Sequence, residues 1–298
     1  MRLMGELAAL GTALCWATGS NFFMAAGRRM GSLVLNRLRI TTAALFLGAA
    51  LWLTKGSPWP VWATSAQVGV LAVSGLVGFV FGDSFYFRAL VILGAGKATL
   101  LTSLAPIFTA LLARVFLGET LGTRAMLGIG LTLGGLVWVL WGRVQSEHRH
   151  PEGSVLVGVV SGVLAAVGQA VGYVLSKEGL RDGLDPLSAT VIRVAAAFVA
   201  VWLLAPAQGG WRRNVEALRD RVAARAMVGG AFFGPFLGVT LSLFALAHTS
   251  TAIAASIMAC YPIPTILLAA RFHRERITPR MASGALATIT GVLILFLR

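Results

Sequence analysis

The chain contains one stretch of sequence twice. Positions 106–135 align without a gap to positions 262–291, an offset of 156, and 12 of these 30 positions are identical. Apolar composition explains matched leucines, but not a proline, a glutamate, an arginine and two glycines in register. These pairs are Pro106 with Pro262, Glu119 with Glu275, Arg124 with Arg280, Gly128 with Gly284 and Gly135 with Gly291. We therefore predict two copies of one unit, residues 1–143 and 154–298, joined by a linker at 144–153.

The composition places both copies in a membrane. The chain has 298 residues, of which 57% are hydrophobic and 12% charged, and its mean hydropathy is +0.82. A water-soluble protein needs more polar surface than this. The apolar runs are about 20 residues long, which suits a helix that crosses a hydrocarbon core, and helices satisfy their own backbone groups there.

Short polar breaks divide each copy into five predicted spans. They lie at about 4–25, 33–54, 67–87, 98–117 and 125–142, and at about 155–176, 187–205, 227–247, 252–270 and 281–297. Because five is odd, the second copy enters the membrane from the opposite side. The expected fold is therefore an all-α membrane protein with ten transmembrane helices in two inverted five-helix repeats, a plan common among secondary transporters.

The basic residues predict the orientation. The formal net charge is +14, but these residues sit in loops between spans rather than on one polar face, so we do not expect nucleic acid as a partner. Of the 25 Lys and Arg, 15 fall on the side opposite the termini, 7 on the side of the termini and 3 in the first turns of spans. The positive-inside rule then puts both termini outside the cytoplasm.

Several motifs resemble a known transporter repeat. The first copy contains Trp16-Ala17-Thr18-Gly19-Ser20-Asn21-Phe22, Phe87-Arg88-Ala89-Leu90, Leu104-Ala105-Pro106-Ile107 and Phe116-Leu117-Gly118-Glu119-Thr120, and the second contains Ala245-Leu246-Ala247, Tyr261-Pro262 and Arg274-Glu275-Arg276-Ile277-Thr278. Together they resemble the EamA repeat of the drug/metabolite transporter superfamily. The resemblance implies ten helices, alternating access and small metabolites as substrates. Relatives commonly keep their termini in the cytoplasm, and here we follow the charges instead.

Asp83 is the most informative polar residue within a span. An ionisable side chain in a bilayer costs about 2.5 to 3.5 kcal/mol on insertion scales, so it needs a partner, water or a function. Arg88 and Lys97 follow in the sequence, and Arg37 enters from the same side. Asp83 is then either a charged or proton-handling group in a cavity, or half of a structural ion pair near the headgroups.

Other polar residues within the spans are candidates to line a substrate cavity, although hydrogen bonds between helices explain them equally well. With Asp83, the candidates are Trp16, Asn21, Tyr86, Thr102, Ser103, Gln169, Tyr173, Ser242 and Tyr261.

Three prolines are predicted to bend spans, because each removes a backbone donor within a helix. These candidate hinges are Pro106, Pro262 and Pro264. Charges that recur in both copies at span ends are predicted to be structural, since they serve both halves alike. They are Arg37, Arg193, Glu119, Glu275, Arg124 and Arg280.

These features favour a secondary transporter, by resemblance an exporter, of small amino-acid-like or other polar or amphipathic solutes. We expect a multi-pass protein of a cell membrane, such as the bacterial inner membrane, with the bilayer and a small molecule as partners and the proton as a candidate coupling ion. The chain has no nucleotide-binding loop, and we expect no cofactor, metal or catalytic residue. One alternative is a lipid flippase or scramblase with the same fold. A membrane-embedded enzyme is the other, and the four histidines argue against it because they fall in loops or at span ends.

Overall fold

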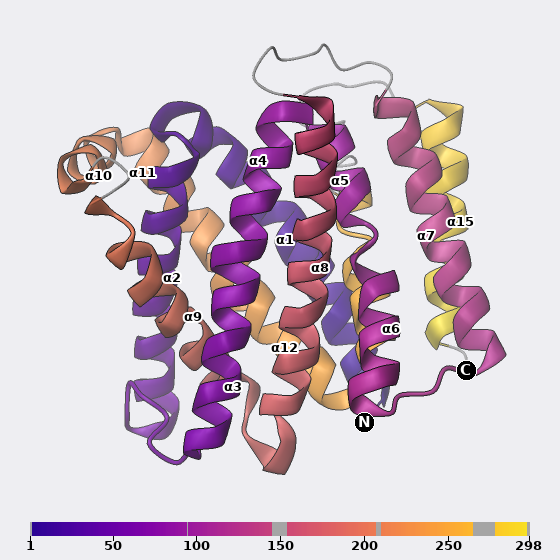
Figure 1. Ribbon diagram of the computed structural model, residues 1–298, viewed down its shortest axis with the longest axis horizontal. Helices are drawn as coiled ribbons and strands as arrows, with labels where there is room; N and C mark the ends of the chain where they lie inside the picture. Colours follow the sequence, from indigo (N-terminus) through magenta and orange to yellow (C-terminus); the bar gives the residue numbers. More distant parts are fainter. Residues whose placement is uncertain (1, 94, 145–153, 207–209, 265–277, 297–298) are drawn as a thin grey trace.

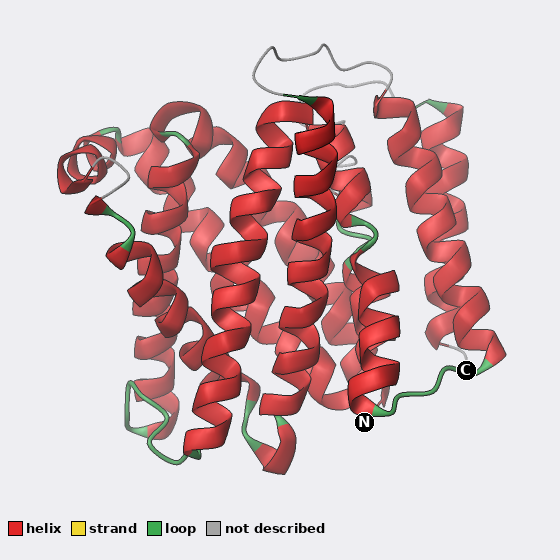
Figure 2. Cartoon of the chain, viewed as in Figure 1, coloured by secondary structure: helices red, strands yellow, loops and turns green. Residues whose placement is uncertain are grey.

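The computed structural model describes the chain except residues 1, 94, 145–153, 207–209, 265–277 and 297–298. Within these limits every regular element is helical (Figure 2). The elements of the first half are α1 (Arg2–Met30), α2 (Ser32–Lys55), α3 (Ser65–Gly75), η1 (Leu76–Gly82), α4 (Asp83–Leu93), α5 (Ala95–Thr102), α6 (Ala105–Leu117) and α7 (Thr123–Val144). Those of the second half are α8 (Val155–Gly179), η2 (Arg181–Gly183), α9 (Pro186–Leu203), α10 (Gly210–Arg219), α11 (Arg221–Ala231), η4 (Phe232–Gly238), α12 (Val239–His248), α13 (Thr251–Met258) and α15 (Pro279–Phe296).

The helices are long and apolar enough for a multi-pass membrane protein. In the described part of the chain, six helical stretches meet the length and hydropathy of a membrane span, and three shorter helices are also apolar. The six are Leu33–Lys55, Ser65–Tyr86, Val155–Gly179, Pro186–Leu203, Arg221–His248 and Pro279–Phe296. Helix α1 is not one of these six, but its 29 residues would extend for roughly 43 Å.

The internal repeat reappears in the element boundaries. Helix α3, the π-helix η1 and helix α5 begin and end 156 positions before α11, η4 and α13. Figure 1 shows the first residues of α1 and the end of α15 at the same end of the bundle. Helices α2 and α9 pack in one buried cluster that includes Leu47, Leu51 and Val201, so each half contributes to the same core.

Helices α7 and α15 pack through the repeated glycines and lie side by side at the right of Figure 1. A Cβ added at Gly135 would lie 2.6 Å from the carbonyl oxygen of Gly284 and from the amide nitrogen of Thr288. The Thr288 hydroxyl donates to the Thr132 carbonyl oxygen at 3.3 Å. The glycines therefore bring two helix backbones together without an intervening side chain, as small residues do in membranes.

The structure differs from the sequence prediction at three places. The segment 208–225, predicted as a break between spans, contains the short helix α10, which Figure 1 shows nearly end-on beside the upright helices. The predicted span 98–117 is not one bent helix, because α5 ends at Thr102 and α6 begins at Ala105. The predicted span 252–270 is interrupted in the same way, because α13 ends at Met258 and residues 259–261 form a turn before Pro262. Pro106 occupies the first turn of α6, where a missing N–H disrupts no helical hydrogen bond.

Candidate functional site

A cavity of about 250 Å³ lies between the two halves of the chain. Helices α1, α2, α4, α5 and α6 of the first half line it together with α8, α9, α12 and α13 of the second. The two π-helices also contribute, with Gly78, Phe79 and Gly82 from η1 and with Gly234 and Pro235 from η4. π-Helical turns often occur at functional sites. Here they occur at equivalent places in both repeats.

The cavity brings together most of the polar residues that the sequence singled out. The lining includes Trp16, Asp83, Tyr86, Thr102, Ser103, Gln169, Tyr173, Ser242 and Tyr261, and also Pro106. Asn21 is not among the described lining residues, and its side-chain nitrogen donates to the Ala17 carbonyl oxygen of its own helix at 2.8 Å. Of the other predicted hinges, Pro262 is buried, Pro264 is half-buried, and neither lines the cavity.

Asp83 has a different partner from those considered in the sequence. Its Oδ2 accepts a hydrogen bond from Nη2 of Arg39, which comes from α2. The Arg39 Nε also donates to Asn36 Oδ1 at 2.8 Å, so the guanidinium is held from two sides. Arg88 is exposed, and the side chain of Lys97 lies outside the described residues. The ion pair therefore crosses between helices within the cavity.

Arg193 lies in the cavity although the sequence grouped it with the structural charges. It is two turns into α9 and only 4% exposed, and its Cζ lies 5.1 Å from the centroid of the Phe79 ring. Among the described residues, its Nε has no hydrogen-bond partner. Its repeat mate Arg37 is also buried, at 2% exposed, but does not line the cavity. The two arginines thus occupy different environments.

The three tyrosines of the chain all line the cavity. The hydroxyls of Tyr86 and Tyr261 are hydrogen-bonded to each other and to Thr99. Gln169 donates to the Tyr173 hydroxyl at 3.0 Å within α8. The Tyr261 ring meets that of Trp16 edge to face, with centroids 6.1 Å apart. The wall therefore combines aromatic faces with hydroxyl groups, which suits an amphipathic molecule.

Contacts at the end of the bundle where α1 begins join the two halves. The Glu119 carboxylate follows α6 and accepts hydrogen bonds from the Thr251 backbone nitrogen at 2.8 and 3.0 Å and from its hydroxyl at 2.7 Å. It thus caps the first turn of α13, where a negative charge is favourable. Nearby, Lys177 donates to the carbonyl oxygens of Leu246 and Thr249, a contact within the second half.

The remaining predicted structural charges have separate environments. Arg280 stacks over the Trp138 ring, with its Cζ 4.4 Å from the centroid, and donates to the Trp138 carbonyl oxygen at 3.1 Å. It therefore ties α15 to α7. Arg124 is exposed. Glu275 lies outside the described residues.

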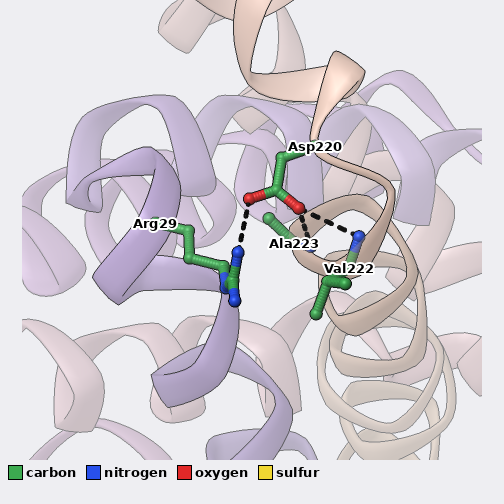
Figure 3. A network of polar contacts seen from close by, with 4 residues as sticks. All are labelled: Arg29, Asp220, Val222 and Ala223. Carbon is green, nitrogen blue, oxygen red and sulfur yellow. Dashed lines mark hydrogen bonds and ion pairs between the residues drawn. The ribbon is translucent and has the colours of Figure 1, made fainter.

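A polar network joins α1 to α11 outside the cavity (Figure 3). Asp220 precedes α11 and accepts from the backbone nitrogens of Val222 and Ala223 at 3.0 and 3.1 Å. Its other carboxylate oxygen lies 2.9 Å from Nη1 of Arg29. The hydrogen bond from Ala223 and the nearby guanidinium of Arg29 lower the pKa of Asp220. The carboxylate therefore stays charged and caps the helix.

Sequence reasoning did not assign several of the lining residues to the site, among them Phe23, Phe79, Arg39 and Arg193. Phe23 and Phe79 carry no polar signal within an apolar span, and Arg39 and Arg193 were counted as residues of the first turns. One available signal was the depth of Arg193, because a position two turns into a span is costly for a charge that has no function.

Comparisons with known proteins show the family and the fold of the chain. The EamA-like transporter family matches residues 3–141 and 156–297. An uncharacterised protein of Pseudomonas aeruginosa is 31% identical over 260 residues, which cover 87% of this chain and 82% of that protein. An uncharacterised transporter of Archaeoglobus fulgidus is 24% identical over 98% of this chain and 97% of its own length. The transporter YdfC of Bacillus subtilis, also uncharacterised, is 26% identical over 75% of this chain and 70% of its own length.

A solved crystal structure shares the fold, with a TM-score of 0.78 and 20% identity over 98% of this chain and 96% of that one. The two matched segments cover both copies of the repeat found in the sequence, with the cavity between them. The chain therefore belongs to the EamA-like transporter family.

Proposed function

We propose that the chain is a secondary transporter that moves small amino-acid-like or related amphipathic solutes by alternating access. Its ten spans form two inverted five-helix repeats, and the cavity between them holds the solute. One observation carries the proposal: helices from both halves line a single cavity that contains charged, aromatic and hydroxyl-bearing residues within an apolar bundle. Binding sites at the interface of inverted repeats are a general feature of such carriers.

The contacts at one end of the bundle support alternating access. The carboxylate of Glu119, from the first half, accepts hydrogen bonds from the backbone nitrogen and hydroxyl of Thr251 in the second half. For the cavity to open toward this end, these bonds must break. Hydrogen bonds to a charged group contribute about 1.5 to 3 kcal/mol each at most, so a bound solute can supply a comparable bias.

The broken fourth span supports a binding role for the centre of the bundle. Helix α5 ends and α6 begins beside the cavity, and Thr102, Ser103 and Pro106 all belong to the lining. Discontinuous helices of this kind direct helix ends at solutes in transporters. An amino-acid-like solute has the small size and the mixture of charge and apolar surface that this lining suits.

The direction proposed is export, with both termini outside the cytoplasm. The excess of basic residues on the side opposite the termini supports this orientation. A reporter that is active only in the periplasm, fused after Arg298, is expected to be active. A silent reporter, together with an active cytoplasmic reporter at the same position, would reverse the proposed orientation.

Transport is tested with purified protein in proteoliposomes loaded with single metabolites, using protein-free liposomes as the control. The expected result is protein-dependent efflux of at least one small amphipathic solute, measured at two pH values to detect proton coupling. Movement of fluorescent lipids between leaflets, with no solute efflux, would instead indicate a flippase or scramblase. Absence of efflux for every solute would contradict the proposal.

A further inference from the structure

We propose that Arg193 binds the carboxylate of the transported solute, which defines the substrate class as small carboxylates with an apolar body. The inference rests on the proposed transport function of the cavity. It is carried by a buried guanidinium that lines the cavity and forms no salt bridge with a carboxylate of the described residues, since Asp83 is bonded to Arg39.

The position of Arg193 is set by its backbone rather than by an ion pair. Its carbonyl group lies so close to Gly75 of α3 that no side chain fits at that glycine. The guanidinium then extends past a second glycine, since a Cβ added at Gly78 would lie 3.2 Å from its Nη2. These two glycines open the path by which the side chain reaches the cavity. These close contacts fix Arg193 inside the bundle, whereas an arginine that snorkels extends its side chain toward the lipid headgroups.

The charged side chains of the lining carry a net positive charge, which favours the binding of an anion. Among the described lining residues, the charged side chains are Arg39, Asp83 and Arg193. Asp83 is hydrogen-bonded to Arg39, so its charge is largely committed to that pair. Arg193 also interacts with the charge of Asp83, so two cations of the lining share one carboxylate. A buried cation is unfavourable unless it is fully paired and hydrogen-bonded. A solute carboxylate in the cavity would neutralise Arg193 and accept hydrogen bonds from its guanidinium group, in the planar geometry that arginine offers to carboxylates.

A second feature of the cavity favours the same sign of charge. The first turn of α6 reaches the lining through Ala105 and Pro106, and no side chain caps this turn in the described part of the chain. The amino-terminal end of a helix carries about half a positive charge. Trp16 and Phe79 of the same lining offer aromatic surface for the apolar part of the solute. The lining as a whole is therefore suited to an amphipathic anion.

The test compares acids with amides of the same shape. The probes are L-phenylalanine with L-phenylalaninamide and 3-phenylpropanoate with 3-phenylpropanamide, measured by the thermal stabilisation of purified protein in detergent and by counterflow in proteoliposomes. Three variants are compared with the native protein: Arg193→Gln, Arg193→Lys and Arg181→Gln. Arg181 is the matched control because it loses the same charge at an exposed site outside the cavity.

We expect the acids to stabilise the native protein and the Arg181→Gln variant, and the amides to do so at least tenfold more weakly. Arg193→Gln should lose at least tenfold in affinity for the acids while its affinity for the amides changes little. Arg193→Lys should recover part of the loss, because it restores the charge without the planar fork. The affinity for the amides also reports whether the variant cavity is still folded.

The proposal is overturned if acids and amides bind the native protein equally, if no acid binds, or if Arg193→Gln binds acids as the native protein does. Failure of the transport function is a separate result. Acids that bind in detergent but do not move across proteoliposomes would support the role of Arg193 and contradict transport. Counterflow of the amides alone would support transport and contradict the role of Arg193.

Discussion

The ion pair between Asp83 and Arg39 should contribute measurably to stability. Replacing Asp83 with Asn leaves Arg39 and Arg193 as two cations that line the same cavity. Breaking a fully buried pair costs about 3 to 5 kcal/mol. The Asp83 and Arg39 side chains are 28% and 12% exposed, so water screens part of this energy. We therefore expect Asp83→Asn to cost about 1 to 3 kcal/mol.

A double-mutant cycle separates the pair from other effects of each change. Asp83→Asn, Arg39→Gln and the double variant are unfolded in mixed micelles by increasing SDS, and unfolding is followed by tryptophan fluorescence. If the pair forms as described, the double variant should lose about 1 to 2 kcal/mol less than the sum of the single losses. Single losses that add within about 0.3 kcal/mol would refute the reasoning.

Three further predictions concern packing and caps outside the cavity. Gly135→Ala should lower stability by about 1 to 3 kcal/mol in the same unfolding assay, because the added Cβ would clash with the backbone of α15. Gly134→Ala is the control: its Cβ would meet no atom within 4 Å, so the change should be neutral or stabilising. Equal effects of the two changes would contradict the described packing. Glu119→Ala should cost about 1 to 3 kcal/mol by removing the acceptor of the Thr251 backbone nitrogen and hydroxyl in the first turn of α13, while the Ser250 cap remains. A loss below about 0.3 kcal/mol would exclude this role. Because the folded-state pKa of Asp220 is lowered, its stabilisation is complete above its ordinary pKa of about 3.9 and is lost as the pH falls through the folded value. The difference in stability between the native protein and Asp220→Ala should therefore shrink below about pH 4, and a difference that grows with acidity would be the wrong sign.

Two physical constraints make the repeat, the membrane location and many of the cavity residues predictable from the sequence. A polar residue inside an apolar span is costly, so residues such as Tyr86, Tyr173 and Gln169 stand out from their apolar neighbours in the sequence itself. Repetition with a fixed offset adds a second constraint, because two copies of one unit fold alike. The matching boundaries of η1 and η4 follow from it.

Partners across helices could not be predicted, because sequence spacing describes neighbours on one helix only. Asp83 was therefore compared with Arg88 and Lys97, whereas its partner Arg39 lies on α2. The repeat also leads to a wrong prediction of the environment of Arg193. Equivalence with Arg37 predicts a shared structural role, but only Arg193 lines the cavity. Pro106 was predicted to bend a helix, whereas the chain begins a new helix at Ala105.

The central claim is that solute passes through the cavity between the two halves. It is tested most directly with Ser20→Cys, which places a thiol in the cavity wall, after Cys15 and Cys260 have been replaced. Proteoliposomes containing this variant are treated with a maleimide, and counterflow of a transported solute is measured. We predict that labelling stops transport and that a saturating solute slows the labelling. Unimpaired transport by fully labelled protein would contradict a pathway through this cavity.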